Sequence, residues 1–391
     1  MILHPFLRCL EFVTTLLTVA GMGYFVAAWW AARSFLAEVE SVSSYNPGVS
    51  ILKSLKGLDP GMIDAFRTHC QQEYTGEYEL LFGVASLDDP AVAAVEALRL
   101  EFPARTIRLV ECPERLGTNG KVSTLVQMIP HAQHNFLLIN DSDITVTPQY
   151  LARIMGCFDP ATGGKQVGLV TALYRGRAHG TLPSQLEALG IATDFQAGVL
   201  LSRKLEKGLH YGLGSTLAVR REALARIGGL ETLVDQLADD YELGARVDQA
   251  GFRIELSPEV VETSVPAYDW QGFVDHQLRW SRTVRDARPW GYVGLIFTHG
   301  LAWAILNALL CGLSAPSLAL LGISLFLRAW LAMTVGYDTL GDSEVLASLW
   351  LLPLRDLAQL GIWAAGFAGN TIVWRGERFA LKGGKLFKTD K

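Results

Sequence analysis

Two carboxylates, Asp141 and Asp143, directly follow a short apolar run at residues 136–139. Four apolar residues are too few to cross a membrane but suit a buried strand. In an open α/β sheet, ligands bind beyond the carboxyl ends of the strands. A D-x-D pair there can hold Mg²⁺ or Mn²⁺, usually completed by substrate phosphates. The pair therefore predicts a metal and nucleotide-sugar diphosphate site with both aspartates as metal ligands. A polar turn before a helix near Pro148 is the alternative, because short motifs often occur by coincidence.

Two further acidic pairs stand at the ends of expected elements. Asp88 and Asp89 follow an expected strand, where a carboxylate can accept hydrogen bonds from a nucleotide base or ribose. Asp239 and Asp240 stand where a helix is expected to begin. A carboxylate there can act as general base, because a hydroxyl is a poor nucleophile until its proton is accepted. For both pairs, capping of the following helix is the structural alternative.

Basic residues accompany these acids. Lys121 follows Gly117 and Gly120 and can meet a phosphate or a base, although a solvated surface lysine is the alternative. Arg279 belongs to a run whose arginines recur every three residues, and its planar fork suits a departing diphosphate. The remaining arginines of that run are expected to lie at a membrane interface, together with nearby tryptophans: Arg282, Arg285 and Arg288. The glycine-rich run at residues 211–216 can approach a sugar or phosphate, or form a turn.

The elements that must position these groups alternate between strand and helix. Strands are expected at residues 49–52, 78–85, 106–111, 136–139, 165–172 and 214–219. Helices are expected after Asp59-Pro60 and at residues 91–100, 122–128, 184–195, 241–250 and 270–289. Such alternation predicts an α/β domain with a mostly parallel, doubly wound sheet.

Apolar segments at both ends predict an integral membrane protein. Half of the 391 residues are hydrophobic. Residues 11–32 have the length of a membrane span. A cleaved signal peptide is the alternative, but its apolar core would be shorter. Arg33 then favours a cytosolic catalytic domain. Three more apolar segments are expected to span or re-enter the membrane: 291–312, 314–336 and 345–374. The last contains Arg355-Asp356, interpreted as a membrane boundary.

Composition excludes other classes and suggests a division of the chain. The net charge of −5 argues against nucleic-acid binding, and five scattered cysteines form no zinc or disulfide pattern. The expected division is a transmembrane anchor at 1–40, a catalytic domain at 45–288, membrane segments at 289–374 and a basic tail at 375–391.

The order of these motifs resembles family 21 glycosyltransferases, the ceramide glucosyltransferase-like group of membrane-bound GT-A enzymes. That family has three separated aspartate sites followed by Q/R-x-x-R-W. Asp89, Asp141 and Asp240 match the three sites in this sequence. Arg279 and Trp280 match the last motif. Shorter matches occur at Leu52-Lys53, at residues 117–121 and at residues 374–376, so the resemblance runs from the anchor to the tail.

The resemblance implies an inverting transfer of a hexose from a UDP-sugar to a lipid hydroxyl at the cytosolic face. Asp89 would hold the uridine, Asp240 would be the base, and Arg279 with Trp280 would close over the UDP or the acceptor. His276 stands where the family has Gln or Arg, which affects the contact expected there. The sequence around these motifs also resembles a bacterial branch associated with hopanoid biosynthesis. Ceramide and a hopanoid polyol are therefore both expected acceptors, and the expected sugar is glucose or N-acetylglucosamine.

That branch places the protein in the bacterial inner membrane. Two alternatives remain at this stage: a processive polysaccharide synthase with the same catalytic domain, and an inactive membrane-tethered binding protein. Three apolar segments after the catalytic domain are few for a secretion channel, and the acidic positions are intact.

Overall fold

A seven-stranded mixed sheet forms the centre of the computed structural model, which describes residues 3–38, 43–374 and 377–388. The strand order is β3-β2-β1-β4-β6-β5-β7. All neighbours are parallel except β6, which runs antiparallel to β4 and β5. The predicted α/β, mostly parallel fold is thereby confirmed. The strands are β1 (Val49–Ser54), β2 (Tyr78–Val84), β3 (Thr106–Glu111), β4 (Phe136–Ile139), β5 (Val167–Ala178), β6 (Leu217–Arg220) and β7 (Arg253–Val265).

Strand β4 is apolar throughout because both faces of the sheet are covered. Phe136 and Leu138 belong to one hydrophobic core, and Leu137 and Ile139 belong to the other. Side chains alternate between the faces of a strand, so a strand buried on both sides reads as a continuous apolar run. This places the residue after Ile139 at the carboxyl edge of the sheet.

Helices cover both faces of this sheet. One core contains side chains of α2 (Met62–Cys70), α3 (Ala91–Glu101) and α5 (Tyr150–Gly156). The other contains side chains of α4 (Gly120–Met128), α8 (Arg221–Arg226) and α9 (Asp239–Gln249). Short 3-10 turns occur at Ile129–His131, Pro160–Thr162, Leu230–Leu233, Leu295–Thr298 and Leu349–Leu351.

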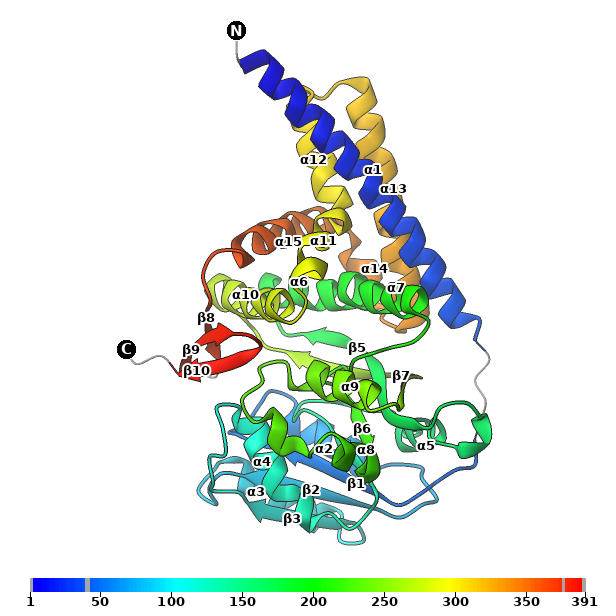
Figure 1. Cartoon of the computed structure of the whole chain (residues 1–391), viewed down its shortest axis with the longest axis vertical. Coiled ribbons are helices and arrows are strands. Elements are labelled where there is room, and N and C mark those ends of the chain that lie inside the picture. The colour runs from blue at the N-terminus through cyan, green and yellow to red at the C-terminus, as the bar shows by residue number, and fades with distance from the viewer. Residues whose placement is uncertain (1–2, 39–42, 375–376, 389–391) are drawn as a thin grey trace.

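A helical layer separates the sheet from the apolar helices (Figure 1). It consists of α6 (Leu182–Gly190), a π-helix at Ile191–Phe195, α7 (Gln196–Glu206) and α10 (Trp270–Ala287). The helix expected at residues 184–195 is therefore longer and continues through the π-helix. This layer therefore lies between the sheet and the apolar helices.

Within the described ranges, three helices are long and apolar enough to cross a membrane: Phe6–Leu36, Ala315–Thr339 and Glu344–Gly366. A further candidate consists of two apolar helices, Pro289–Thr298 and Gly300–Leu310, which meet at a bend of 55°. Such a bend occurs in a broken span or in a re-entrant loop. The elements here are α1 (Leu3–Leu36), α11 (Pro289–Gly294), α12 (Gly300–Leu310), α13 (Ala315–Ala332), a π-helix at Met333–Thr339, α14 (Glu344–Ser348) and α15 (Leu352–Gly366). Figure 1 shows α1, α12 and α13 projecting together from the helical layer.

The C-terminal residues form a small antiparallel sheet that the sequence patterns did not predict. Its strands are β8 (Thr371–Trp374), β9 (Glu377–Lys382) and β10 (Lys385–Lys388), in the order β10-β9-β8. The last apolar segment therefore ends as a helix at Gly366 and not at residue 374. Arg375 and Lys391, counted in the expected basic tail, lie outside the described residues.

Candidate functional site

All ten predicted site residues line a single cavity of about 1550 Å³. It lies at the carboxyl edge of β4 and extends under α10 to the apolar helices. The predicted residues in its lining are Asp88, Asp89, Lys121, Asp141, Asp143, Asp239, Asp240, His276, Arg279 and Trp280. Groups up to 192 positions apart in the sequence, Asp88 and Trp280, thus share one space.

The D-x-D pair directly follows β4, and buried neighbours fix its position. Asn140 donates hydrogen bonds to Oη of Tyr150 at 2.9 Å and to the carbonyl of Ser215 at 2.7 Å. Nζ of Lys53 donates to the carbonyl of Asp141 at 2.9 Å. The next helix, α5, begins after Gln149, so the pair does not cap it. The alternative of a capping turn is therefore wrong.

Asp143 is held by β7, a strand that the sequence did not predict. Its Oδ2 accepts hydrogen bonds from Oγ1 of Thr263 at 2.6 Å and from the backbone N–H of Ser264 at 2.8 Å. Burial, followed by repulsion from Asp141, raises the pKa of the Asp143 carboxyl. Two fixed donors orient this side chain before any ligand binds.

Lys121 lies inside the acidic cluster and is not a solvated surface lysine. The side chain of Asn119 caps α4 by accepting from the N–H of Val122, which sets the first turn of the helix. Nζ of Lys121 then lies 2.6 Å from Oδ1 of Asp141 and 3.7 Å from Oδ2 of Asp239. Burial lowers the pKa of Lys121, but the aspartates outweigh it and the net shift is upward. The lysine therefore remains charged.

Asp239 and Asp240 occupy the first turn of α9, and its N-cap is Ala238. The expectation that one of them caps the helix is wrong. Burial raises the pKa of both carboxyls, and burial together with the neighbouring Asp239 raises that of Asp240 to about 6. A group with this pKa is ionised at neutral pH yet can accept a proton, as a general base must.

The glycine-rich run beside Asp240 permits close packing. A Cβ on Gly214 would lie 2.9 Å from Oδ2 of Asp240, and one on Gly212 would lie 2.9 Å from the carbonyl oxygen of Asp240. Contacts below 3.0 Å force a shift of one partner. The two glycines therefore allow the loop before β6 to lie directly against the carboxylate of Asp240.

Asp89 has a structural task at the opposite side of the cavity. Its carboxylate accepts from the N–H of Gly57 at 3.0 Å and from that of Ala91 at 2.9 Å. It therefore joins the loop after β1 to the start of α3, but the N-cap of α3 is Pro90, so Asp89 is not the helix cap. Asp88 is exposed and lines the same cavity. Binding of a base or ribose by this pair stays a prediction.

The carboxylate of Glu187 organises the residues of α10 that face the cavity. Its Oε2 lies 2.9 Å from Nδ1 of His276 and accepts from Nε2 of Gln277 at 3.1 Å. The ring of His276 stacks on Tyr268 at 5.4 Å and lies 5.0 Å from Trp280. The histidine that departs from the family pattern is therefore locked between an acid and two aromatic rings.

The other arginines of α10 bind the protein itself. Arg282 donates to the carbonyl of Ala368 at 2.8 Å. Arg285 donates to Oδ1 of Asn370 at 2.6 Å, and Arg288 donates to Oη of Tyr241 at 2.8 Å. They fasten α10 to the segment before β8 and to α9, and their expected position at a membrane interface stays a prediction. Arg279 and Arg288 also line the cavity.

The donor set fits a hard cation only in part. Among the described residues, no group of three or more His, Cys, Asp or Glu side chains is arranged to hold a metal. Asp141, whose side chain is 45% exposed, and Asp143 supply carboxylate oxygens, which Mg²⁺ and Mn²⁺ prefer. Two carboxylates fit such an ion when phosphate oxygens of a substrate complete the coordination.

Several residues that shape the site were missed or undervalued. Lys53 is completely buried in β1, and burial lowers its pKa to about 7. A lysine inside an apolar strand is a signal in itself, because an ammonium group is buried only beside partners. Glu187 and Thr263 carry no such signal, because their partners are distant in the sequence.

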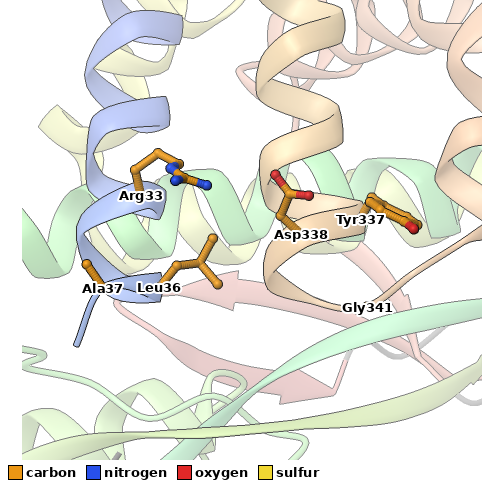
Figure 2. A pocket seen from close by; sticks show the side chains of 6 residues that line it. All are labelled: Arg33, Leu36, Ala37, Tyr337, Asp338 and Gly341. Carbon is orange, nitrogen blue, oxygen red and sulfur yellow. The ribbon is translucent and has the colours of Figure 1, made fainter. Parts of the chain in front are cut away.

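A second cavity, of about 710 Å³, lies where the end of α1 meets the π-helix Met333–Thr339. Figure 2 shows Arg33 pointing toward Asp338 across it. None of the ten predicted site residues lines this space. We therefore place the functional site in the larger cavity.

The sequence profile of glycosyl transferase family 21 matches residues 13–387. The chain belongs to this family. Ceramide glucosyltransferase 3 of Caenorhabditis elegans is similar to the chain, with 25% identity over 390 residues, covering 95% of this chain and 82% of the relative. Ceramide glucosyltransferase 1 of the same organism is 24% identical, covering 88% and 74%.

A solved structure supports the fold. The mannosyltransferase PcManGT from Pyrobaculum calidifontis, in complex with GDP-Man and Mn²⁺, has a TM-score of 0.56 to this chain. The two are 20% identical, and the match covers 92% of this chain and 97% of that one. The predicted family and the predicted glycosyltransferase fold are both confirmed, and this family 21 chain is a glycosyltransferase.

Proposed function

We propose that this family 21 glycosyltransferase moves a hexose, glucose or N-acetylglucosamine, from a UDP-sugar to a hydroxyl of a membrane lipid. The acceptor is a ceramide or a hopanoid polyol. The observation that carries the proposal is the single cavity that contains the acidic cluster and also reaches Tyr292, His299 and Trp363 beside the apolar helices. A soluble nucleotide sugar and a lipid hydroxyl can meet only in a cavity that adjoins both the acidic cluster and the apolar helices. The similarity to two ceramide glucosyltransferases supports this substrate class.

Asp240 is the proposed general base. Its carboxylate is buried, carries a pKa raised to about 6, and lies against a loop whose glycines leave no side chain in the way. The acceptor hydroxyl gives its proton to Asp240 as its oxygen forms a bond to the anomeric carbon. The bond from that carbon to the diphosphate breaks on the opposite face, so the configuration inverts. Asp239 accompanies Asp240 and raises its pKa.

The diphosphate end of the donor is assigned to Asp141, Asp143, Lys121 and Arg279. Asp141 and Asp143 would hold Mg²⁺ or Mn²⁺, which when bound neutralises charge on the departing UDP. Lys121 and Arg279 add positive charge to the same region of the cavity. We assign Asp88 and Asp89 to the uridine of the donor. His276 and Trp280 line the part of the cavity that α10 forms.

The same proposal places the protein in a membrane with the sheet in the cytosol, the inner membrane if the source is bacterial. The UDP-sugar pool is then on the side of the catalytic domain. We also propose the division into an anchor, a catalytic domain and membrane segments as outlined from the sequence. The C-terminal sheet replaces the basic tail in that scheme.

Turnover by the full-length protein in lipid nanodiscs tests this function. UDP-glucose or UDP-N-acetylglucosamine is supplied with Mn²⁺ and with either ceramide or a hopanoid polyol, and products are read by mass spectrometry. We expect one glycolipid, and a rate lower by about 10²–10⁴-fold for Asp240→Asn with UDP binding retained. A ladder of products would indicate a processive synthase, and UDP-sugar binding without product would indicate an inactive binding protein.

A further inference from the structure

We infer that the end of the cavity nearest the apolar helices is a recognition site for the neutral polar head of the acceptor lipid, with Arg355 and His299 as its hydrogen-bonding groups. The inference rests on the proposed function and specifies its substrate side. It concerns residues far from the acidic cluster: Arg355 belongs to α15, and His299 lies in the break between α11 and α12.

Both side chains are buried yet incompletely bonded. Arg355 and His299 are each only 5% exposed, and both line the cavity. Within the described part of the chain, neither Nε of Arg355 nor Nε2 of His299 has a hydrogen-bond partner. A buried polar atom without a partner is costly, so such atoms mark places where a ligand or water completes the bonding.

The position of Arg355 is built by its surroundings. A Cβ on Gly190 would collide with the guanidinium group, so only a glycine in α6 lets the arginine lie against that helix. One terminal nitrogen donates to Oε1 of Gln359 at 3.0 Å, and the other lies 3.6 Å from Oδ2 of Asp194. These contacts fix the fork and leave Nε–H without a hydrogen-bond partner. Arg355 and Asp356 are both buried within the protein, and their interpretation as a membrane boundary stays a prediction.

The break in the apolar helix pair positions His299. The two helices meet at 55°, and His299 is the residue between them. Its carbonyl accepts the first backbone bond of α12, from Trp303 at 3.0 Å, while its ring lies 6.0 Å from Trp363. Irregular backbone among apolar helices is tolerated where it lines a protein cavity. The imidazole at this bend lies in the lining of the cavity.

Charge balance selects a neutral head group. Arg355 is paired with Asp194. The neighbouring Arg328 is paired with Asp356 through two contacts, of 2.9 and 3.1 Å. These two pairs leave no net charge for an ionic ligand: a phosphate would meet Asp194, and an ammonium would meet Arg355. Hydroxyl and amide oxygens can accept from Nε–H of Arg355 and bond with Nε2 of His299 without adding a charge.

Photolabelling tests the site without requiring turnover. Full-length Asp240→Asn protein in nanodiscs is exposed to a photoactivatable ceramide, a photoactivatable alkyl tetrol or a photoactivatable phosphatidic acid, and labelled peptides are mapped. The test variant combines Arg355→Gln with Asp194→Asn, which keeps the charge balance; His299→Leu is a second variant. We expect label on the segments around His299 and Arg355, and about tenfold less label from the neutral probes in either variant.

Asn307→Ala is the matched control. Asn307 is buried in α12 and donates to Thr14 and Thr15 of α1, but it does not line the cavity. It should leave the labelling unchanged, and UDP binding should be unchanged in all variants. Preference for ceramide over the tetrol, or the reverse, distinguishes an amide alcohol from a polyol acceptor, and either result supports the site. Equal labelling by phosphatidic acid, or full labelling of both variants, would overturn it.

The outcomes also separate this inference from the proposed function. If the protein labels as expected but transfers no hexose, the head-group site is supported and the proposed activity is wrong. If the protein transfers a hexose while both variants label and turn over like the parent, the proposed activity is supported and the head-group site is wrong. In active protein, the double variant should raise the KM for the lipid by about tenfold and leave the KM for the UDP-sugar unchanged.

Discussion

Nζ of Lys121 lies 2.6 Å from Oδ1 of Asp141, so a cation from the first turn of α4 already sits at the carboxylate that follows β4. The same nitrogen is 3.7 Å from Asp239, and its charge also favours the ionised form of Asp240. Lys121 therefore links the donor side of the cavity to the proposed base. Removal of Lys121 therefore affects both the donor side of the cavity and Asp240. The pH dependence of the reaction reports the effect on Asp240.

We predict that Lys121→Gln moves the acid limb of the pH–rate profile to higher pH. Asp240 acts only when deprotonated, so activity falls as pH drops through its pKa of about 6. Loss of a nearby positive charge makes the carboxylate harder to ionise and raises that pKa. The measurement is kcat/KM between pH 5 and 8.

Asp239→Asn provides the opposite change, because it removes the negative neighbour that raises the pKa of Asp240. Its acid limb should move to lower pH, and Lys121→Arg should leave the limb near that of the parent. Acid limbs that move in the same direction in Lys121→Gln and Asp239→Asn would exclude Asp240 as the group that titrates.

Gly214→Ala should lower kcat by about 10–100-fold while the protein stays folded. The added Cβ would lie 2.9 Å from Oδ2 of Asp240 and displace the proposed base. A displacement of about 1 Å can cost two orders of magnitude in rate. Gly322→Ala is the control, because a Cβ there meets no atom within 4 Å. Equal kinetics for the two variants would show that the position of Asp240 does not limit the reaction.

His276→Gln should retain most activity, whereas His276→Ala should lose at least about tenfold in kcat/KM. Glutamine at position 276 can still donate a hydrogen bond to Glu187, which is 3% exposed. The second donor to Glu187, Gln277 at 3.1 Å, is present in both variants. Alanine leaves that buried carboxylate with one donor fewer, at a cost of about 1–3 kcal/mol. Steady-state kinetics and thermal unfolding of both variants provide the comparison. A glutamine variant as impaired as the alanine variant would assign the imidazole itself to the substrate.

Much of the catalytic edge could be predicted from the sequence, because its signals are local. Strand β4 is recognisable as four apolar residues, and Asp141 and Asp143 follow it at once. Strand β7 is different, because it carries Glu255, Glu259 and Glu262 among its apolar residues. Glu259 is only 1% exposed and is neutralised by Arg153, which is 106 residues away in the chain. The partner that makes this strand possible is not visible in its own sequence.

The C-terminal sheet was overlooked for a related reason. Its lysines are typical of a basic tail, yet Phe379, Leu381 and Leu386 alternate with them and face one core. Gly383 and Gly384 adopt positive φ angles of 60° and 75° between β9 and β10, as in a tight hairpin turn. The alternation and the glycine pair indicate a hairpin, whereas the charge of the segment indicates a solvated tail, so the two signals conflict.

This sheet gives the last prediction, which concerns the loop before Asp239. Leu386 is 2% exposed and packs in the cluster that contains Leu237. Its backbone N–H donates to the carbonyl of Asp235 at 2.9 Å, and the N–H of Leu237 donates to Gly384 at 3.0 Å. The C-terminal sheet therefore holds the residues that lead directly into α9 and its two carboxylates.

Leu386→Ala should reduce kcat by at least about tenfold with only a small change in the main unfolding transition. Truncation of a buried leucine costs about 2–5 kcal/mol, and here that loss falls on a small cluster separate from the two cores of the main sheet. Phe387→Ala is the matched control, since the adjacent Phe387 is 50% exposed. Activity assays, thermal unfolding and limited proteolysis of the C-terminal segment distinguish the two. Because neighbouring residues of β10 face opposite sides, equal activity losses in the two variants would mean that the sheet does not position Asp239 and Asp240 through Leu237.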